Sequence, residues 1–242
     1  MKSLKILSST ILLTACVLAQ APFGAMQGSV TAEDGAPVAG AVVSYSRITR
    51  LVGPAAQARP APGEAVVRSS ISSDTNGAFA ASNLPAGEYV LCAEVPSGPY
   101  LNPCKWSSSP KATIAAGAVH RPALALKRGV FLKVRVNDPR GLLPPVKNDP
   151  SRAPNLILGV VFGSGAFLAA ATTRADQSGR DYQMSIPAGV PLKLWVFSRH
   201  VTLTDAMGLP VDNSGGRIPF QAVAGRDQVF TLNVSGRDPQ SP

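Results

Sequence analysis

Few residues in this chain have both the type and the spacing that enzyme chemistry requires. The 242 residues include two histidines and three cysteines, whereas a zinc hydrolase needs at least three protein ligands and an open coordination position. His120 precedes Arg-Pro-Ala and His200 precedes Val-Thr-Leu, so neither begins an HxxE or HExxH motif. We therefore predict that the chain is not an enzyme and that it carries no metal and no cofactor.

Two further patterns come near a chemical site. Gly163-Ser164-Gly165 approaches the Gly-x-Ser-x-Gly elbow of serine hydrolases, but it lies between two apolar runs and is interpreted as a hairpin turn. Asp74 and Asp176 each begin a sequence that resembles the start of a calcium loop, yet the later oxygen ligands are absent. Aspartate and glycine at this spacing are typical of a tight turn, which we predict at both positions.

The first 19 residues have the layout of an export signal. Lys2 and Lys5 precede a nearly uncharged apolar run, which is shorter than the roughly 20 residues that span a bilayer. Cleavage after Ala19 would leave a secreted chain. Alternatively, Leu-Thr-Ala-Cys at 13–16 resembles a bacterial lipobox, which would make Cys16 a lipidation site. We expect an exported protein that is periplasmic, secreted or on the outer surface, with membrane attachment only if Cys16 is lipidated.

Cys92 and Cys104 are the remaining cysteines. An even pair in an exported chain is typical of a disulfide, and the spacing does not match CxxC redox chemistry. Closing this loop would stabilise the chain by about 3 kcal/mol in the chain-entropy model. Because constrained loops on rigid scaffolds display recognition residues, we predict a partner-binding surface here, formed by Tyr100, Lys105 and Trp106.

The two tryptophans are the residues best suited to stack on a sugar ring. Trp106 follows the second cysteine in a polar segment and is predicted to be exposed, whereas Trp195 lies in a dense apolar run and is predicted to be in the core.

The chain is basic, with a formal net charge of +9. This charge favours anionic partners such as a polysaccharide, lipid headgroups or an acidic protein, although scattered charge is also typical of a solvated surface. Nucleic acid is excluded, because no aromatic stacking positions lie among the charges. One segment is especially basic, and it contains Arg121, Lys127, Arg128, Lys133, Arg135, Arg140, Lys147 and Arg152.

A signature occurs twice and sets the expected architecture. Asp-Thr-Asn-Gly at 74–77 is followed by Leu-Pro-Ala-Gly at 84–87, and Asp-Gln-Ser-Gly at 176–179 by Ile-Pro-Ala-Gly at 186–189, with the same spacing. Such a repeat predicts two copies of one small β-domain. No segment has a sustained apolar period of 3.6 residues, so little helix is expected.

Alternation and turn signals divide each copy into strands. In the first copy, Phe79 should enter the core and residues 50–63 should form a long exposed loop. In the second copy, Val130, Leu132, Val134 and Val136 should face inward, and residues 143–154 and 204–216 should be loops. Strands are expected at 27–31, 38–45, 66–73, 88–95, 112–115, 120–126, 130–136, 156–162, 167–173, 182–186, 192–198, 217–223 and 229–234.

Several elements of the first copy resemble a known family. Gly28-x-Val30, Asp34-Gly35, Pro-Val-Ala-Gly-Ala at 37–41, and the signature at 74–89 occur in the order found in the carboxypeptidase regulatory-like domain, a transthyretin-like β-sandwich. The resemblance covers about residues 27–95, and the second copy lacks the Pro-Val-Ala-Gly-Ala segment. It implies a scaffold or recognition module and not peptidase activity, because this family is an accessory to the catalytic domain.

These observations predict an all-β chain of two tandem transthyretin-like or immunoglobulin-like β-sandwiches. The expected parts are a signal peptide at 1–19, sandwiches at 27–127 and 129–236, and a flexible tail at 237–242. The predicted function is a non-catalytic binding, adhesion or spacer module at the bacterial cell envelope, whose partner is an anionic polysaccharide, a carbohydrate more generally, or another envelope protein. The alternatives are a structural envelope protein that pairs through edge strands and, less favoured, an unrecognised hydrolase.

Overall fold

The computed structural model describes residues 23–61, 63–96, 98–143, 156–163, 165–212 and 214–238. The predicted signal peptide, Cys16 and most of the predicted loop at 143–154 lie outside these residues. The described part is almost entirely β, as predicted. Its one α-helix, α1 (Pro103–Trp106), has four residues, and no helix there is both long and apolar enough to cross a membrane.

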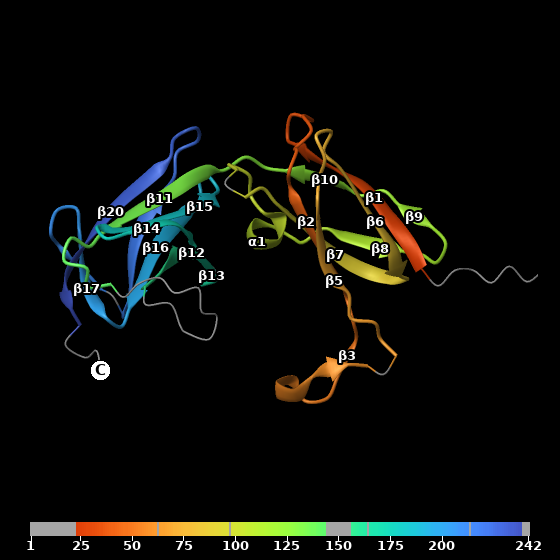
Figure 1. Cartoon of the computed structure of the whole chain (residues 1–242), viewed down its shortest axis with the longest axis horizontal. Coiled ribbons are helices and arrows are strands. Elements are labelled where there is room, and N and C mark those ends of the chain that lie inside the picture. Colours follow the sequence, from red (N-terminus) through yellow and green to blue (C-terminus); the bar gives the residue numbers. More distant parts are fainter. Residues whose placement is uncertain are drawn as a thin grey trace, which may run out of the picture.

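The first half of the chain forms a sandwich of two sheets (Figure 1). One sheet has the order β10-β1-β6, with β9 also paired to β1, and the other has the order β5-β2-β7-β8. The strands are β1 (Phe23–Ala32), β2 (Val42–Arg47), β5 (Arg68–Ser72), β6 (Ala78–Pro85), β7 (Gly87–Glu94), β8 (Lys111–Ile114), β9 (Val119–His120) and β10 (Ala123–Leu126).

The second half forms a sandwich of a six-stranded and a four-stranded sheet. Their orders are β14-β15-β11-β20-β17-β18 and β13-β12-β16-β19. The strands are β11 (Val130–Asn137), β12 (Leu156–Val161), β13 (Phe167–Ala169), β14 (Ala171–Asp176), β15 (Gly179–Ile186), β16 (Pro191–Ser198), β17 (Val201–Asp205), β18 (Pro210–Val211), β19 (Ser214–Gln221) and β20 (Gln228–Arg237). Because β20 extends to Arg237, the predicted tail begins inside a strand.

The two halves have the same strand order, as expected if the chain contains two copies of one domain. β1 and β11 each lie between an antiparallel strand, β6 or β15, and a parallel strand, β10 or β20. The facing sheets then correspond strand by strand, β5-β2-β7-β8 to β13-β12-β16-β19. What differs is added to this common plan: β14 and the β17–β18 hairpin in the second half, and a projecting segment between β2 and β5 in the first.

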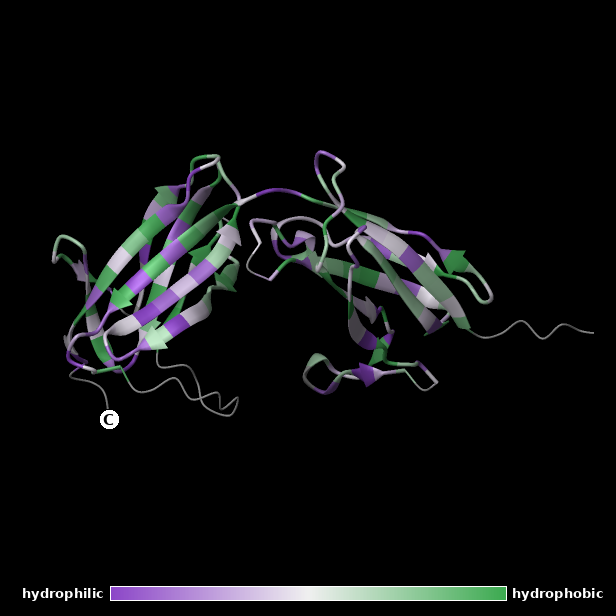
Figure 2. Ribbon diagram, turned by 45° about the horizontal axis from the view of Figure 1, so that its top comes forward, coloured by the Kyte–Doolittle hydropathy of each residue, from purple (hydrophilic) through white to green (hydrophobic). Residues whose placement is uncertain are grey.

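Each sandwich has its own hydrophobic core. Hydrophobic and hydrophilic residues alternate along many of the strands (Figure 2). In strands such as β7 and β11 buried positions alternate with more exposed ones, as expected where one face of a sheet is buried. Phe79 and the predicted inward face of β11 are buried, and Tyr89, Leu91 and Ala93 have no exposed surface. The hydroxyl of Tyr89 donates to the carbonyl of Pro85 at 2.8 Å, so its one polar atom has a partner; burial raises the pKa of Tyr89.

Both signature turns occupy the same place in their sandwiches, before β6 and before β15. The Asp74 carboxylate accepts from the backbone N–H groups of Asn76 and Ala78, each at 2.8 Å. Gly77 has φ 73°, and a Cβ added to it would lie 2.4 Å from the carbonyl oxygen of Val30 on β1. Glycine is therefore required here for backbone conformation and for the close approach of β1.

Three expectations about strands were wrong. The strand expected at 167–173 is two strands in different sheets, because the chain crosses between them at Ala170, whose N–H donates to the carbonyl of Leu158. The expected loop at 204–216 instead contains the end of β17, the strand β18 and the start of β19. Most of β17 had been missed, although it buries Val201 and Leu203. The strand expected from residue 38 begins at Val42, because Gly40 turns the chain at φ 68°.

The segment expected to be a long exposed loop at 50–63 has structure of its own. It contains the paired strands β3 (Leu51–Val52) and β4 (Arg59–Pro60) and the 3-10 turn η1 (Ala55–Gln57). It extends away from the first sandwich (Figure 1).

The two functions of Gly77 can be separated by mutation. Gly77→Ala should lower the free energy of unfolding by about 3 kcal/mol or more, because it combines positive-φ strain with a backbone clash. Gly35→Ala is the matched control, because Gly35 has φ 81° but open space around its Cβ position; it should cost about 1–2 kcal/mol. Urea unfolding of both variants measures the difference, and equal losses would show that close packing against β1 does not matter.

Candidate binding cleft between the sandwiches

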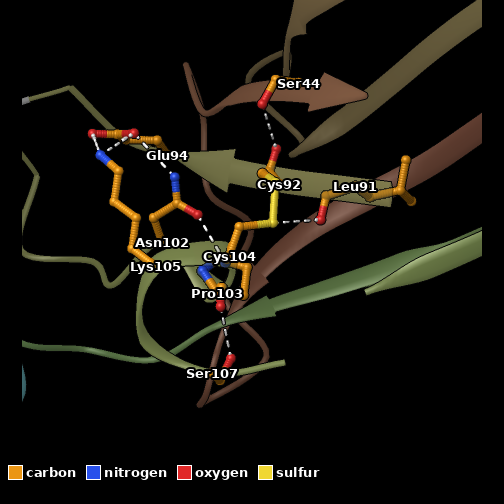
Figure 3. The surroundings of a disulfide bond; sticks show 9 residues. All are labelled: Ser44, Leu91, Cys92, Glu94, Asn102, Pro103, Cys104, Lys105 and Ser107. Atoms are coloured by element: carbon orange, nitrogen blue, oxygen red, sulfur yellow. Dashed lines mark hydrogen bonds and ion pairs between the residues drawn. A yellow bond between two sulfur atoms is a disulfide. The ribbon is translucent and has the colours of Figure 1, made fainter. Parts of the chain in front are cut away.

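Cys92 and Cys104 form a disulfide that ties α1 to the outer face of β7 (Figure 3). Cys92 is on the face of β7 opposite to the buried Leu91 and Ala93. The helix is started by Asn102, whose side-chain oxygen accepts from the N–H of Cys104 at 2.9 Å, and Pro103 occupies the first helical position. One short helical turn is thus held on the sheet by a covalent bond and a cap.

Glu94 at the end of β7 binds the same segment through polar contacts. Lys105 Nζ lies 3.1 and 3.0 Å from the two carboxylate oxygens, and the amide of Asn102 donates at 3.0 Å (Figure 3). Burial raises the pKa of Glu94, but the hydrogen bonds from Lys105 and Asn102 outweigh it, so the net shift is downward. The charge of Lys105 is therefore neutralised within the chain at neutral pH.

Trp106, predicted to be exposed, is half-buried against the second sandwich. Its ring contacts the edge of Phe162, with the ring centroids 4.6 Å apart. The neighbours of Trp106 in sequence are polar, which is why exposure was predicted. The sequence does not show that the second sandwich packs against the disulfide loop. Trp106 therefore contacts the second sandwich of the same chain.

The remainder of the disulfide loop lies along the connection between the sandwiches. The N–H of Leu101 donates to the carbonyl of Lys127, and the N–H of Gly129 donates to the carbonyl of Pro99. Across the junction, the hydroxyl of Ser185 on β15 donates to the carbonyl of Gly98 at 2.8 Å. Trp106 and these bonds join the loop to both sandwiches.

Between the sandwiches lies a cleft of about 740 Å³, within the usual size range of ligand sites. The three predicted partner-binding residues, Tyr100, Lys105 and Trp106, all line its first wall. The opposite wall was not anticipated, because it depends on how the second sandwich faces the first. It consists of one aromatic ring, aliphatic side chains and uncharged polar groups, among them Phe131, Leu168, Thr172, Thr173, Gln183 and Met184.

Trp195 was predicted to be in the core but lies on the outer face of β16. The inward residues of this strand are Leu192, Leu194 and Val196, and Trp195 alternates with them. Its ring lies parallel to that of Phe197, with centroids 5.7 Å apart, and it also contacts Phe167 at 4.6 Å. The outer aromatic row, defined here as Phe167, Trp195 and Phe197, is separate from the cleft lining.

The basic segment from Arg121 to Arg152 does not form one positive surface among the described residues. Lys133 pairs with Asp227 at 2.7 Å. Arg135 lies 3.2 Å from Asp181 and 3.5 Å from Asp176, and Arg128 stacks over the Tyr100 ring at 5.6 Å. The Arg140 guanidinium donates to the carbonyl of Ser235. Most of the described cations of this segment therefore have partners within the chain, while Lys147 and Arg152 lie outside the described residues.

Of the residues considered for catalysis or metal binding, those that the structure describes are not assembled into a site. His120 is on β9 in the first sandwich and His200 follows β16 in the second; Ser164 lies outside the described residues. Within the described ranges no three His, Cys, Asp or Glu side chains are grouped to hold a metal ion. Asp176 accepts from the hydroxyl and the N–H of Ser178, which, with Arg135 and Arg174 nearby, lower its pKa to about 2. The Asp176 carboxylate thus stabilises the turn between β14 and β15.

No protein-family model matches the sequence, and no curated protein matches it. Among solved structures, the chain is similar to a streptococcal ancillary pilin (12% identity, TM-score 0.39, 90% of this chain and 63% of the pilin). It is also similar to the Bacillus anthracis TIE protein (11%, 0.34, 88% and 34%) and to BcpA, the major pilin subunit of Bacillus cereus (11%, 0.32, 83% and 85%). The chain thus spans about a third of the TIE protein and less than two thirds of the ancillary pilin. The β-sandwich assignment rests on the strand order and the two cores.

Removing the disulfide tests whether it holds α1 in place. Cys92→Ser with Cys104→Ser should lower the free energy of unfolding by about 2–4 kcal/mol. Trp106 fluorescence should shift to longer wavelength, because the ring would leave Phe162 for water. Adding Trp106→Phe to the same double variant leaves Trp195 as the one tryptophan of the chain. Its spectrum therefore gives the Trp195 contribution, and the difference between the two spectra is the emission of Trp106. An unchanged Trp106 spectrum would show that the helix docks without the bond.

Proposed function

We propose that this chain is an exported, non-catalytic module whose cleft between the two β-sandwiches binds a polysaccharide of the cell envelope. In this proposal residues 27–127 and 129–236 are the two domains, and the first is of the carboxypeptidase regulatory-like type. The observation that carries the proposal is that the predicted partner-binding residues share one cleft with a complementary wall from the second sandwich.

The composition of the cleft suits a sugar chain. Ligand sites combine apolar and aromatic walls with a small number of polar groups that fix orientation. Here the aromatic side chains of Tyr100, Trp106 and Phe131 are accompanied by the hydroxyl and amide groups of Thr172 and Gln183. Because Glu94 neutralises Lys105, stacking and hydrogen bonding would contribute more to binding than charge. Binding should therefore depend only weakly on salt.

The alternative, assembly through edge strands, is less well supported at two of the described sheet edges, β14 and β6. β14 is the edge of the six-stranded sheet, and its register shifts between Thr172 and Arg174. Arg174 also forms an ion pair with Asp176 on the same strand. The edge strand β6 pairs with an irregular register as well. Bulges and charges are the features by which natural sheets block edge-to-edge pairing.

The test is equilibrium binding of the full chain to soluble cell-envelope polysaccharides, both neutral and anionic. Phe131→Ala should weaken binding about tenfold, equivalent to about 1.4 kcal/mol. Phe197→Ala is the matched control, because Phe197 is another half-buried phenylalanine on an outer sheet face but lies in the outer aromatic row. Thr172→Ala and Thr113→Ala form a second matched pair of exposed strand threonines, and only the first lines the cleft.

Three results would contradict the proposal. Binding lost in Phe197→Ala but kept in Phe131→Ala would move the site to the outer aromatic row. Association between copies that ends when Ala80 on β6 is replaced by lysine would favour the edge-strand alternative. Absence of binding to any polysaccharide, with a folded protein, would remove the carbohydrate from the proposal.

A further inference from the structure

The duplication shows that part of the first sandwich is not needed to build the fold. β2 and β5 are antiparallel neighbours, and their counterparts in the second sandwich are β12 and β13. The second sandwich connects its pair through residues 162–166, where the N–H groups of Phe162 and Gly165 close a tight turn. The first sandwich uses residues 48–67 for the same connection. We name the described part of this connection, residues 48–61 and 63–67, the arm.

The arm has its own backbone hydrogen bonds. β3 and β4 pair with Leu51 opposite Pro60 and Val52 opposite Arg59. The N–H of Ala61 donates to the carbonyl of Arg50 at 2.8 Å, and the N–H of Gln57 donates to the carbonyl of Pro54 at 2.8 Å. An ordered ribbon that projects from the sandwich (Figure 1) holds its side chains in place, and Val67 at its base packs against the core.

Arg47, the last residue of β2, fixes the base of the arm. Its guanidinium donates to the Glu64 carboxylate at 2.8 Å and to the carbonyl of Ala65 at 3.2 Å. The other side of the same group donates to the carbonyl of Ala86 at 3.0 and 3.3 Å, between β6 and β7. One partly buried arginine thus joins the returning segment of the arm to the sandwich and also neutralises Glu64, the one carboxylate of the arm's described residues.

The surface of the arm combines apolar side chains with unneutralised cations. Ile48, Leu51 and Val66 are 42%, 58% and 69% exposed. Arg50 and Arg59 are exposed as well, and no carboxylate in the described part of the chain forms an ion pair with either. Leu209, Val223 and Val229 are exposed to a similar degree elsewhere on the chain, so exposure alone does not single out the arm. What distinguishes the arm is that its exposed aliphatic side chains occur on the same short ribbon as these two arginines.

We propose that the arm docks on an anionic lipid surface. Interfacial binding is strengthened by apolar side chains that enter the headgroup region and by cations that attract anionic headgroups. The arm offers both, on a ribbon that extends beyond the body of the protein. Leu51 pairs with Pro60 and Arg59 with Val52, so Leu51 and Arg59 lie on opposite faces of the ribbon. The ribbon would therefore enter the interface by its edge. An anionic polysaccharide would attract the arginines but would give the aliphatic side chains no apolar environment, so lipid fits the whole set of residues better. This surface is independent of the cleft and of the function proposed for it.

The contribution expected from so small a surface is moderate. Each arginine near an anionic membrane should increase partitioning about fivefold. Each aliphatic side chain that enters the interface should add about three- to tenfold. Binding should therefore require anionic lipid and weaken as salt is raised.

The test is co-sedimentation of the processed chain, residues 20–242, which carries neither the apolar run of the predicted signal nor Cys16, with two kinds of vesicle. One is phosphatidylcholine alone and the other is phosphatidylcholine mixed with phosphatidylglycerol. Only the anionic vesicles should bind. Leu51→Gln should reduce partitioning about three- to tenfold, whereas Leu209→Gln, at a leucine that is equally 58% exposed on the β17–β18 turn, should leave it within twofold.

The charge part of the proposal has its own matched control. Arg50→Gln with Arg59→Gln should lower partitioning by more than tenfold, whereas Arg121→Gln with Arg226→Gln removes the same charge from exposed sites elsewhere and should have a much smaller effect. Because all of these side chains are exposed, folding should survive, which a thermal melt checks. Equal effects of arm and control variants would overturn the proposal. The proposal would also be overturned if the parent protein bound no vesicles and Leu51→Gln instead abolished its self-association, because the arm would then bind a second copy of the chain. It would equally be overturned if the parent protein bound no vesicles and Leu51→Gln abolished binding to an anionic polysaccharide, because the arm would then bind a glycan.

Discussion

The bond between Cys92 and Cys104 is the constraint on which the rest of the arrangement depends. It fixes a segment with hardly any regular structure to the outer face of β7. Once that segment is fixed, Trp106 meets Phe162, and Gly98 accepts a hydrogen bond from Ser185. A short connection between two sandwiches would ordinarily leave their relative orientation free to vary. Here the loop contacts both of them, and a cleft results between them.

The duplication separates what the fold needs from what this chain has added to it. Both halves share seven corresponding strands, and the glycine of each signature lies against the strand that starts its own sandwich. The additions differ between the halves: the disulfide loop and the arm in the first, and β14 and the β17–β18 hairpin in the second. The arm and most of the first wall of the cleft belong to these additions, as expected when a rigid scaffold carries its functional residues on loops. The opposite wall is mixed, because Phe131, Leu168 and Gln183 lie on shared strands whereas Thr172 lies on β14.

Local alternation was sufficient to predict the elements that depend on a single sheet face. The inward face of β11 and the turn at Asp74 follow from neighbours in sequence, and the pairing of the two cysteines follows from their number in a chain expected to be exported. Features that depend on residues distant in sequence did not follow. The run at 167–173 has no turn residue that would divide it, and nothing local marks Ala170 as the point of crossing between sheets. Trp195 lies among apolar residues, but the phase of β16 places its ring outside.

The same distinction applies to the candidate site. Tyr100, Lys105 and Trp106 could be chosen because a disulfide loop with aromatic and charged residues stands out in a sequence. The opposite wall, with Phe131 and Gln183, could not be chosen, because those residues look like ordinary outward positions of strands. The arm was expected to be only a loop, since pairs of two-residue strands leave almost no periodic signal.

The central claim is that the disulfide loop holds the two sandwiches in one relative orientation. It is tested most directly by the distance distribution between spin labels on the two sandwiches, attached through unnatural amino acids at the exposed residues Ala80 and Lys193 so that the native cysteines remain paired. We predict one narrow distribution in the oxidised protein and a broad one when both cysteines are replaced by serine. A broad distribution in the oxidised protein would contradict the account, because the sandwiches would then move independently despite the loop.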